Sequence, residues 1–197
     1  MTDVSIILFD GFEPLDMAGP VEVFGDIGEW RLRYFSEHGG SVSCRQGFKV
    51  MTEPFSAMTP ADGILFVPGG MGTRPLSLCT DWLRSLAQFA GESRWVLSVC
   101  TGSVLLAAAG VLDGRKATSN KRSWSWVTSF GSSVRWQPQA RWTADGKFRT
   151  SSGVSAGTDM ALAFVGELFG EARAESIARR MEYIRSRSAD DDPFSVR

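Results

Sequence analysis

The sequence predicts an α/β fold with a largely parallel central sheet. Short apolar segments of strand length alternate with longer segments of helical period along the 197 residues, which is the pattern of repeated βαβ units. The apolar stretch 95–99 ends at Cys100 and passes almost directly into an apolar helical run over 104–109. A chain of this length can bury one sizeable core, and no repeat or linker divides it.

The expected strands are apolar runs bounded by glycine, proline or aspartate turns. They cover residues 4–9, 30–36, 64–67 and 95–99, followed by a hairpin that turns at 145–146. Helices are expected where apolar residues recur at helical spacing, over 18–24, 81–90, 104–109, 157–168 and 172–184. Thr80 and Ser155 are the expected caps of the second and fourth helices. Residues 1–187 then form a single domain, and the acidic segment 188–197 is expected to be an exposed tail.

Composition excludes several classes of function. The 21 Lys and Arg residues are balanced by 22 Asp and Glu residues, so the basic surplus of a nucleic-acid binder is absent. No secretory signal or membrane-length apolar run is present, and a cytoplasmic protein without membrane attachment is expected. Three irregularly spaced cysteines and one histidine favour neither a disulfide framework nor a metal site. We expect no cofactor.

Cys100 is the strongest candidate for a reactive group. A cysteine between a buried strand and a helix lies at the helix N-terminus, where unpaired N–H groups and the helix dipole favour the thiolate. The arrangement matches a nucleophile elbow with sulfur in place of the serine oxygen. The alternative is an inert buried thiol. Cys44 and Cys79 lie outside any motif and are interpreted as packing residues.

Other candidates follow from the rule that ligands gather at the carboxyl ends of parallel strands. Asp16 follows the first strand, and it is either an acid/base group or the N-cap of the helix over 18–24. Gly69 and Gly70 follow the third strand and could donate backbone N–H groups to developing charge, although an ordinary tight turn explains them equally. Thr101 could position water or Asp16 through its hydroxyl, and Gly102 could supply a further backbone donor.

Five segments together resemble the DJ-1/PfpI superfamily, and most closely its isocyanide hydratase branch. They occur in the family's order over almost the whole chain: LDMAGP (15–20), VPGG (67–70), SVCTGS (98–103), AAGVLDGRKAT (108–118) and AGTDMAL (156–162). The resemblance implies a flavodoxin-like three-layer sandwich, a homodimer and an elbow cysteine that acts as the nucleophile. Asp16 stands where most members carry Glu, and this agrees with the hydratase branch.

Asn120 is a departure from the family pattern. Members with hydrolase-like chemistry carry a His shortly after the Ala-Thr pair that follows the elbow helix, and here that position is Asn120. His38 is expected on an exposed, glycine-flanked turn. A Cys–His dyad is therefore not expected, which argues against a peptidase because a leaving amine would lack its proton donor.

The function expected from the resemblance is hydration of an isocyanide to an N-substituted formamide. Cys100 would attack the small electrophilic substrate and Asp16 would carry protons, while Trp124 or Trp126 could line an apolar pocket. Two alternatives remain: a glyoxalase-type enzyme acting on small aldehydes, and a non-enzymatic redox or ligand sensor working through Cys100. The fold alone does not decide between catalysis and sensing.

Overall fold

The computed structural model describes residues 1–59 and 62–195. Its centre is an eight-stranded sheet with the order β3-β4-β2-β1-β5-β6-β10-β9, accompanied by a two-stranded sheet of β7 and β8. The strands are β1 (Thr2–Ile7), β2 (Trp30–Ser36), β3 (His38–Ser43), β4 (Lys49–Pro54), β5 (Ile64–Val67), β6 (Trp95–Val99), β7 (Lys116–Ala117), β8 (Arg135–Trp136), β9 (Trp142–Asp145) and β10 (Phe148–Ser151).

The sheet is parallel except at its two edges, where β3 pairs antiparallel with β4 and β9 pairs antiparallel with β10. The central strands β5 and β6 are almost wholly buried, as expected of parallel strands covered on both faces. Their apolar runs therefore lack the alternation of a half-exposed strand. The hairpin expected at 145–146 is confirmed as β9 and β10.

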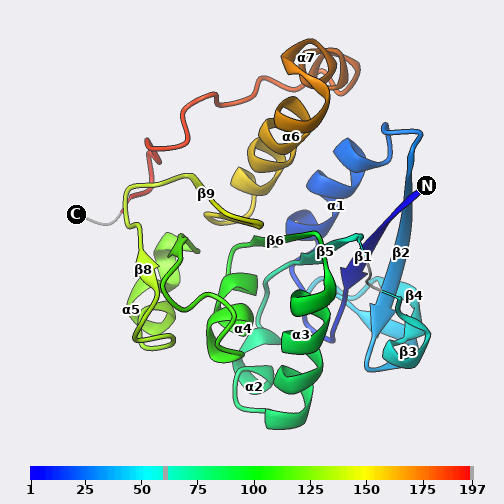
Figure 1. Cartoon of the computed structure of the whole chain (residues 1–197), viewed down its shortest axis with the longest axis vertical. Helices are drawn as coiled ribbons and strands as arrows, with labels where there is room; N and C mark the ends of the chain where they lie inside the picture. The colour runs from blue at the N-terminus through cyan, green and yellow to red at the C-terminus, as the bar shows by residue number, and fades with distance from the viewer. Residues whose placement is uncertain (60–61, 196–197) are drawn as a thin grey trace.

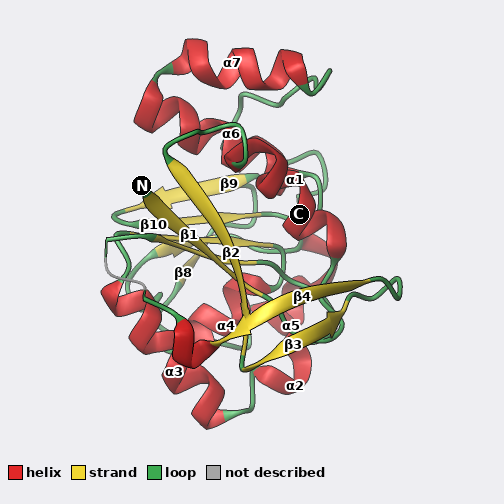
Figure 2. Cartoon of the chain, turned by 90° about the vertical axis from the view of Figure 1, so that its right-hand side faces the viewer, coloured by secondary structure: helices red, strands yellow, loops and turns green. Residues whose placement is uncertain are grey.

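Helices cover both faces of the sheet and complete a three-layer sandwich (Figures 1 and 2). Helices α1, α6 and α7 lie on one side, while α2, α3 and α4 lie on the other. The α-helices are α1 (Pro14–Phe24), α2 (Thr73–Leu76), α3 (Thr80–Glu92), α4 (Gly102–Ala108), α5 (Trp124–Val127), α6 (Ala156–Phe169) and α7 (Glu171–Arg180), with 3₁₀ turns η1 (Phe55–Ala57) and η2 (Lys121–Ser123). The flavodoxin-like α/β class expected from the sequence is confirmed.

Several element boundaries differ from the sequence prediction. Helix α1 begins four residues earlier than expected, at Pro14, because proline is well suited to the first helical position. Helix α7 ends at Arg180, and Glu182 beyond it takes a left-handed backbone conformation with φ of 51°. Thr80 is the first residue of α3 rather than its cap, and Ser155 is the cap residue of α6 without a side-chain hydrogen bond.

Most described residues of the segment 188–195 are exposed, as the sequence predicts, but the segment is anchored to the domain. It runs back from α7 toward the loop before β9 (Figure 1), where the carbonyl of Ala189 accepts hydrogen bonds from the backbone of Arg141 and Trp142. Asp192 is only 1% exposed, and its carboxylate lies 3.8 Å from the Arg141 guanidinium. Residues 196–197 lie outside the described part of the chain.

The cysteines outside the elbow differ from each other. Cys44 is buried as expected, but Cys79 is exposed at the start of α3, so its interpretation as a packing residue is wrong. Within the described residues, no helix is both long and apolar enough to cross a bilayer.

Candidate active site

Cys100 occupies a strained turn between β6 and α4. Its φ is +57°, a conformation that residues other than glycine adopt rarely and mostly where the surrounding structure enforces it. The Cys100 N–H is directed to the carbonyls of Ser151 and Ser152, at 3.2 Å each. This anchors the turn to the end of β10, so the predicted strand–elbow–helix is confirmed.

Asp16 lies in the first turn of α1 and is completely buried. Its Oδ2 accepts a hydrogen bond of 3.0 Å from the Gly69 N–H. The N-cap of α1 is Glu13, so the alternative role of Asp16 as a helix cap is wrong. Burial raises the pKa of Asp16 to about 7, although hydrogen bonds from Gly69, Cys100 and the Val154 amide oppose the shift. A carboxyl with this pKa can accept and return a proton near neutral pH.

The surroundings of the Cys100 thiol oppose its ionisation more than they favour it. Burial raises its pKa, the Asp16 carboxylate adds to the rise, and the Thr101 N–H and the Asn120 side chain oppose it. Only 6% of the residue is exposed. Burial therefore opposes the thiolate, while the backbone donor at the helix N-terminus favours it as predicted. Nucleophilic attack from this thiol requires a base, and Asp16 is the adjacent one.

Asn120 contacts the thiol at the position where hydrolase-like relatives carry histidine. Its Oδ1 accepts a 3.0 Å hydrogen bond from the Ser123 N–H and so caps η2. With the oxygen engaged there, the amide nitrogen faces Gly153 and Cys100. Because an amide nitrogen only donates, Asn120 can stabilise negative charge on sulfur but cannot remove the thiol proton.

Gly69 and Gly70 hold the site together through N–H groups that are already engaged. The Gly69 N–H donates to Asp16, and the Gly70 N–H donates to Thr101 Oγ1 at 3.0 Å. Thr73 Oγ1 approaches the same Thr101 oxygen at 3.1 Å. In this structure the two N–H groups therefore bond to the protein itself, and the Thr101 hydroxyl contacts Gly70 and Thr73; the roles predicted for them toward a substrate stay predictions. The Thr101 N–H is the backbone donor that reaches Cys100.

Glycine is required at positions 69 and 102 by the close approach of neighbouring chain segments. A Cβ on Gly69 would lie 2.6 Å from the Thr101 nitrogen and 2.8 Å from Asp16 Oδ2, and a Cβ on Gly102 would collide with the Val67 carbonyl. Gly102 is fully enclosed in α4 and does not line the pocket. Its predicted role as a donor to substrate is therefore replaced by a packing role.

The thiol opens into a cavity of about 600 Å³. Trp126 lines this cavity and Trp124 does not. Trp124 instead packs edge-on against Trp136 at 6.1 Å, with the Lys121 ammonium 4.8 Å from its ring centre. The remaining lining residues are Glu13, Arg45, Gly70, Met71, Thr73, Arg74, Cys100, Thr101, Asn120, Arg122, Ser123 and Val154. The sequence analysis missed the three arginines, because they belong to three separate segments that converge only in the fold.

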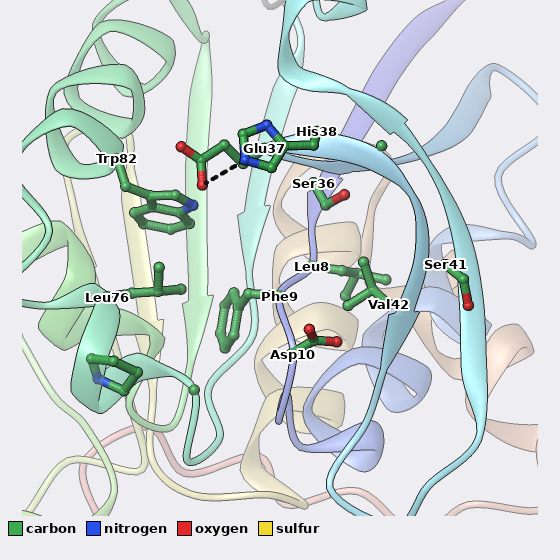
Figure 3. A pocket seen from close by; sticks show the side chains of 13 residues that line it. Leu8, Phe9, Asp10, Ser36, Glu37, His38, Ser41, Val42, Leu76 and Trp82 are labelled. Atoms are coloured by element: carbon green, nitrogen blue, oxygen red, sulfur yellow. Dashed lines mark ion pairs between the residues drawn. The ribbon is translucent and has the colours of Figure 1, made fainter.

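A second cavity, of about 330 Å³, lies beside the ends of β1 and β2 (Figure 3). Phe9, Leu76 and Trp82 form part of its wall. His38 lies at its rim with Nε2 3.8 Å from the Glu37 carboxylate, and its side chain is 87% exposed. The single histidine of the chain therefore belongs to this second cavity, and the expected absence of a Cys–His dyad is confirmed.

The fold and the site together define an α/β protein with a buried elbow cysteine beside a buried carboxyl group. The family profile described as the DJ-1/PfpI family matches residues 2–167. The chain belongs to the DJ-1/PfpI family.

Relatives of this chain include an enzyme and a regulator. It is 29% identical to the isonitrile hydratase of Pseudomonas putida, over 98% of this chain and 86% of that protein. It is 28% identical to the HTH-type transcriptional regulator CdhR of Pseudomonas aeruginosa, over 96% of this chain but only 57% of the regulator. A THiJ/PfpI family protein from Pseudomonas syringae superposes with a TM-score of 0.86 at 28% identity, covering 94% of this chain and 76% of that one.

Proposed function

We propose that this protein is a cofactor-independent hydratase that adds water to an isocyanide and releases an N-substituted formamide. The observation that carries the proposal is a buried thiol at the wall of the cavity, beside a buried carboxyl group whose pKa burial raises to about 7. The similarity to an isonitrile hydratase, isonitrile being another name for isocyanide, supports the same chemistry.

The first half of the reaction forms a carbon–sulfur bond. Asp16, as the carboxylate, takes the Cys100 proton while sulfur attacks the terminal isocyanide carbon. The electron pair left on that carbon then takes the proton back from Asp16, giving a thioimidate, R–N=CH–S–Cys100. The thiol proton has moved to carbon, and Asp16 is again a carboxylate.

The second half releases the product. Asp16 takes a proton from a water molecule while the water oxygen adds to the thioimidate carbon. Asp16 then passes that proton to the thioimidate nitrogen. The carbon–sulfur bond then breaks, and the sulfur recovers the remaining hydroxyl proton as the formamide carbonyl forms. The Asn120 amide and the Thr101 N–H stabilise charge on sulfur while it attacks and while it leaves. No amine leaves in this sequence, so the reaction does not need the histidine of a cysteine peptidase.

Formamide production from a neutral alkyl isocyanide, followed by NMR, tests the proposal. Wild type is expected to turn over, while Cys100→Ala and Asp16→Asn are each expected to lose at least about 100-fold in rate. Cys79→Ala is the matched control, because Cys79 is an exposed thiol outside the cavity. Absence of formamide with wild type, both from this compound and from an isocyanide that carries a carboxylate, would overturn the proposal, and lactate formed from methylglyoxal in a parallel reaction would favour the glyoxalase alternative.

A further inference from the structure

Two arginines at the cavity that contains Cys100 have no carboxylate partner. Arg74 belongs to α2 and Arg122 to η2, and both are exposed where they line the cavity. Neither guanidinium forms an ion pair within residues 1–59 and 62–195. The third arginine of the cavity, Arg45, lies 3.6 Å from the Glu13 carboxylate. The cavity lining therefore has an excess of two positive charges.

The Arg74 side chain is held in place without using its N–H groups. Its guanidinium carbon lies 4.3 Å from the ring centre of Trp126, which is within the range of a cation–π contact. Stacking on an aromatic face leaves the planar fork of N–H donors free for a ligand. By contrast, the exposed Arg84 on α3 uses its guanidinium to bind Asp81 at 2.7 Å.

We propose that the substrate of this site carries a carboxylate, which Arg74 and Arg122 bind while the electrophilic carbon of the same molecule reaches Cys100. Guanidinium groups match the planar pair of oxygens in a carboxylate. A neutral substrate would leave the two-charge excess in the cavity unused. The identity of the electrophilic end rests on the proposed function, whereas the charge at the other end does not.

Alkylation of Cys100 tests the charge preference without any catalytic turnover. Iodoacetate and iodoacetamide both alkylate the Cys100 sulfur and have nearly the same size, but only iodoacetate carries a carboxylate. The two rates are measured by mass spectrometry in a Cys79→Ser background, so that the exposed Cys79 thiol does not consume reagent. The iodoacetate-to-iodoacetamide ratio is then divided by the same ratio for 2-mercaptoethanol.

The normalised ratio is expected to exceed one in the Cys79→Ser protein that retains both arginines. It is expected to fall about fivefold or more in the double variant Arg74→Met/Arg122→Met. Arg84→Met is the matched control, because Arg84 is exposed and lies outside the cavity; its ratio is expected to stay unchanged. The iodoacetamide rate also reports whether the double variant has kept a folded site. A ratio that is the same with and without the two arginines would overturn the inference.

A second measurement separates this inference from the proposed function. Hydration of 4-isocyanobenzoate is compared with that of phenyl isocyanide, and the double variant is expected to lose at least about fivefold more kcat/KM for the carboxylate substrate. If both compounds are hydrated and the variant loses equally for both, the inference fails and the hydratase proposal stands. If neither is hydrated but the alkylation ratio depends on the arginines, the hydratase proposal fails and the carboxylate site stands.

Discussion

Replacing Asp16 with Asn is expected to change how the stability of this protein depends on pH. The Asp16 carboxyl is completely buried, and burial raises its pKa from the usual 3.8 to about 7. The native state therefore keeps this proton over a pH range in which the unfolded chain has already lost it. The contribution of Asp16 to the free energy of unfolding is therefore complete below about pH 3.8, falls as the pH rises toward 7, and is lost above that pH.

The magnitude follows from the pKa shift. Each pH unit within the window removes about 1.4 kcal/mol from the free energy of unfolding. Between roughly pH 5 and pH 8 the wild type is expected to lose about 2.5 kcal/mol that Asp16→Asn does not lose. The asparagine oxygen can still accept the hydrogen bond that the Gly69 N–H now donates to Asp16, so the variant keeps the local contact.

Urea unfolding of both proteins near pH 5, 6, 7 and 8 measures this difference. Other titrating groups are common to the two proteins, so their contributions cancel in the comparison. The substitution itself can add an offset that is the same at every pH, and the prediction concerns the additional difference that changes with pH. If the two curves differ only by such a constant offset, the reasoning is refuted, since Asp16 would then ionise at the same pH in the folded and unfolded chains.

Three further substitutions have defined consequences. Gly69→Ala places a Cβ 2.6 Å from a backbone nitrogen of the elbow; we expect a loss of about 1–3 kcal/mol in urea unfolding and of most formamide-forming activity. Asn120→Ala removes a donor that lowers the pKa of Cys100, and alkylation of that thiol by iodoacetamide is expected to slow about tenfold; an unchanged rate would contradict this role. Arg141→Met breaks a buried 2.6 Å ion pair with Asp159, and is expected to cost about 3–5 kcal/mol and to expose the C-terminal segment to limited proteolysis.

Strands that lie in the centre of the sheet could be predicted from sequence, but those at one edge could not. β5 and β6 are continuous apolar runs, and burial on both faces leaves that pattern in the sequence. β4 alternates between exposed and half-buried residues, β3 buries only Val42, and the two strands include Gly39, Gly40 and Pro54. Such residues are typical of turns, and it is pairing between the two strands that makes them extended.

The groups of the candidate site were predictable, whereas several of their roles were not. Cys100, Asp16 and Asn120 could be identified because strand ends and family motifs fix their positions. The direction in which the pKa of Cys100 shifts could not, since burial by distant segments opposes the effect of the Thr101 N–H at the start of the adjacent helix.

The lining of the cavity depends equally on tertiary structure. Trp124 and Trp126 belong to the same short helix, and only its packing decides that Trp126 faces the cavity. Arg74 and Arg122 come from different elements, and no local pattern connects them. Pairing with a distant side chain, Arg141, also decides that Asp192 in the otherwise exposed C-terminal segment is buried.

The central claim is that Cys100 forms a covalent bond to the isocyanide carbon with Asp16 as its proton carrier. Acid quenching during turnover of an alkyl isocyanide, followed by intact-mass and peptide mass spectrometry, measures this directly. The expected result is an adduct on Cys100 whose added mass equals that of the isocyanide, present in wild type and absent from Cys100→Ala. Formamide production by Cys100→Ala at the wild-type rate, with no adduct in either protein, would contradict the claim.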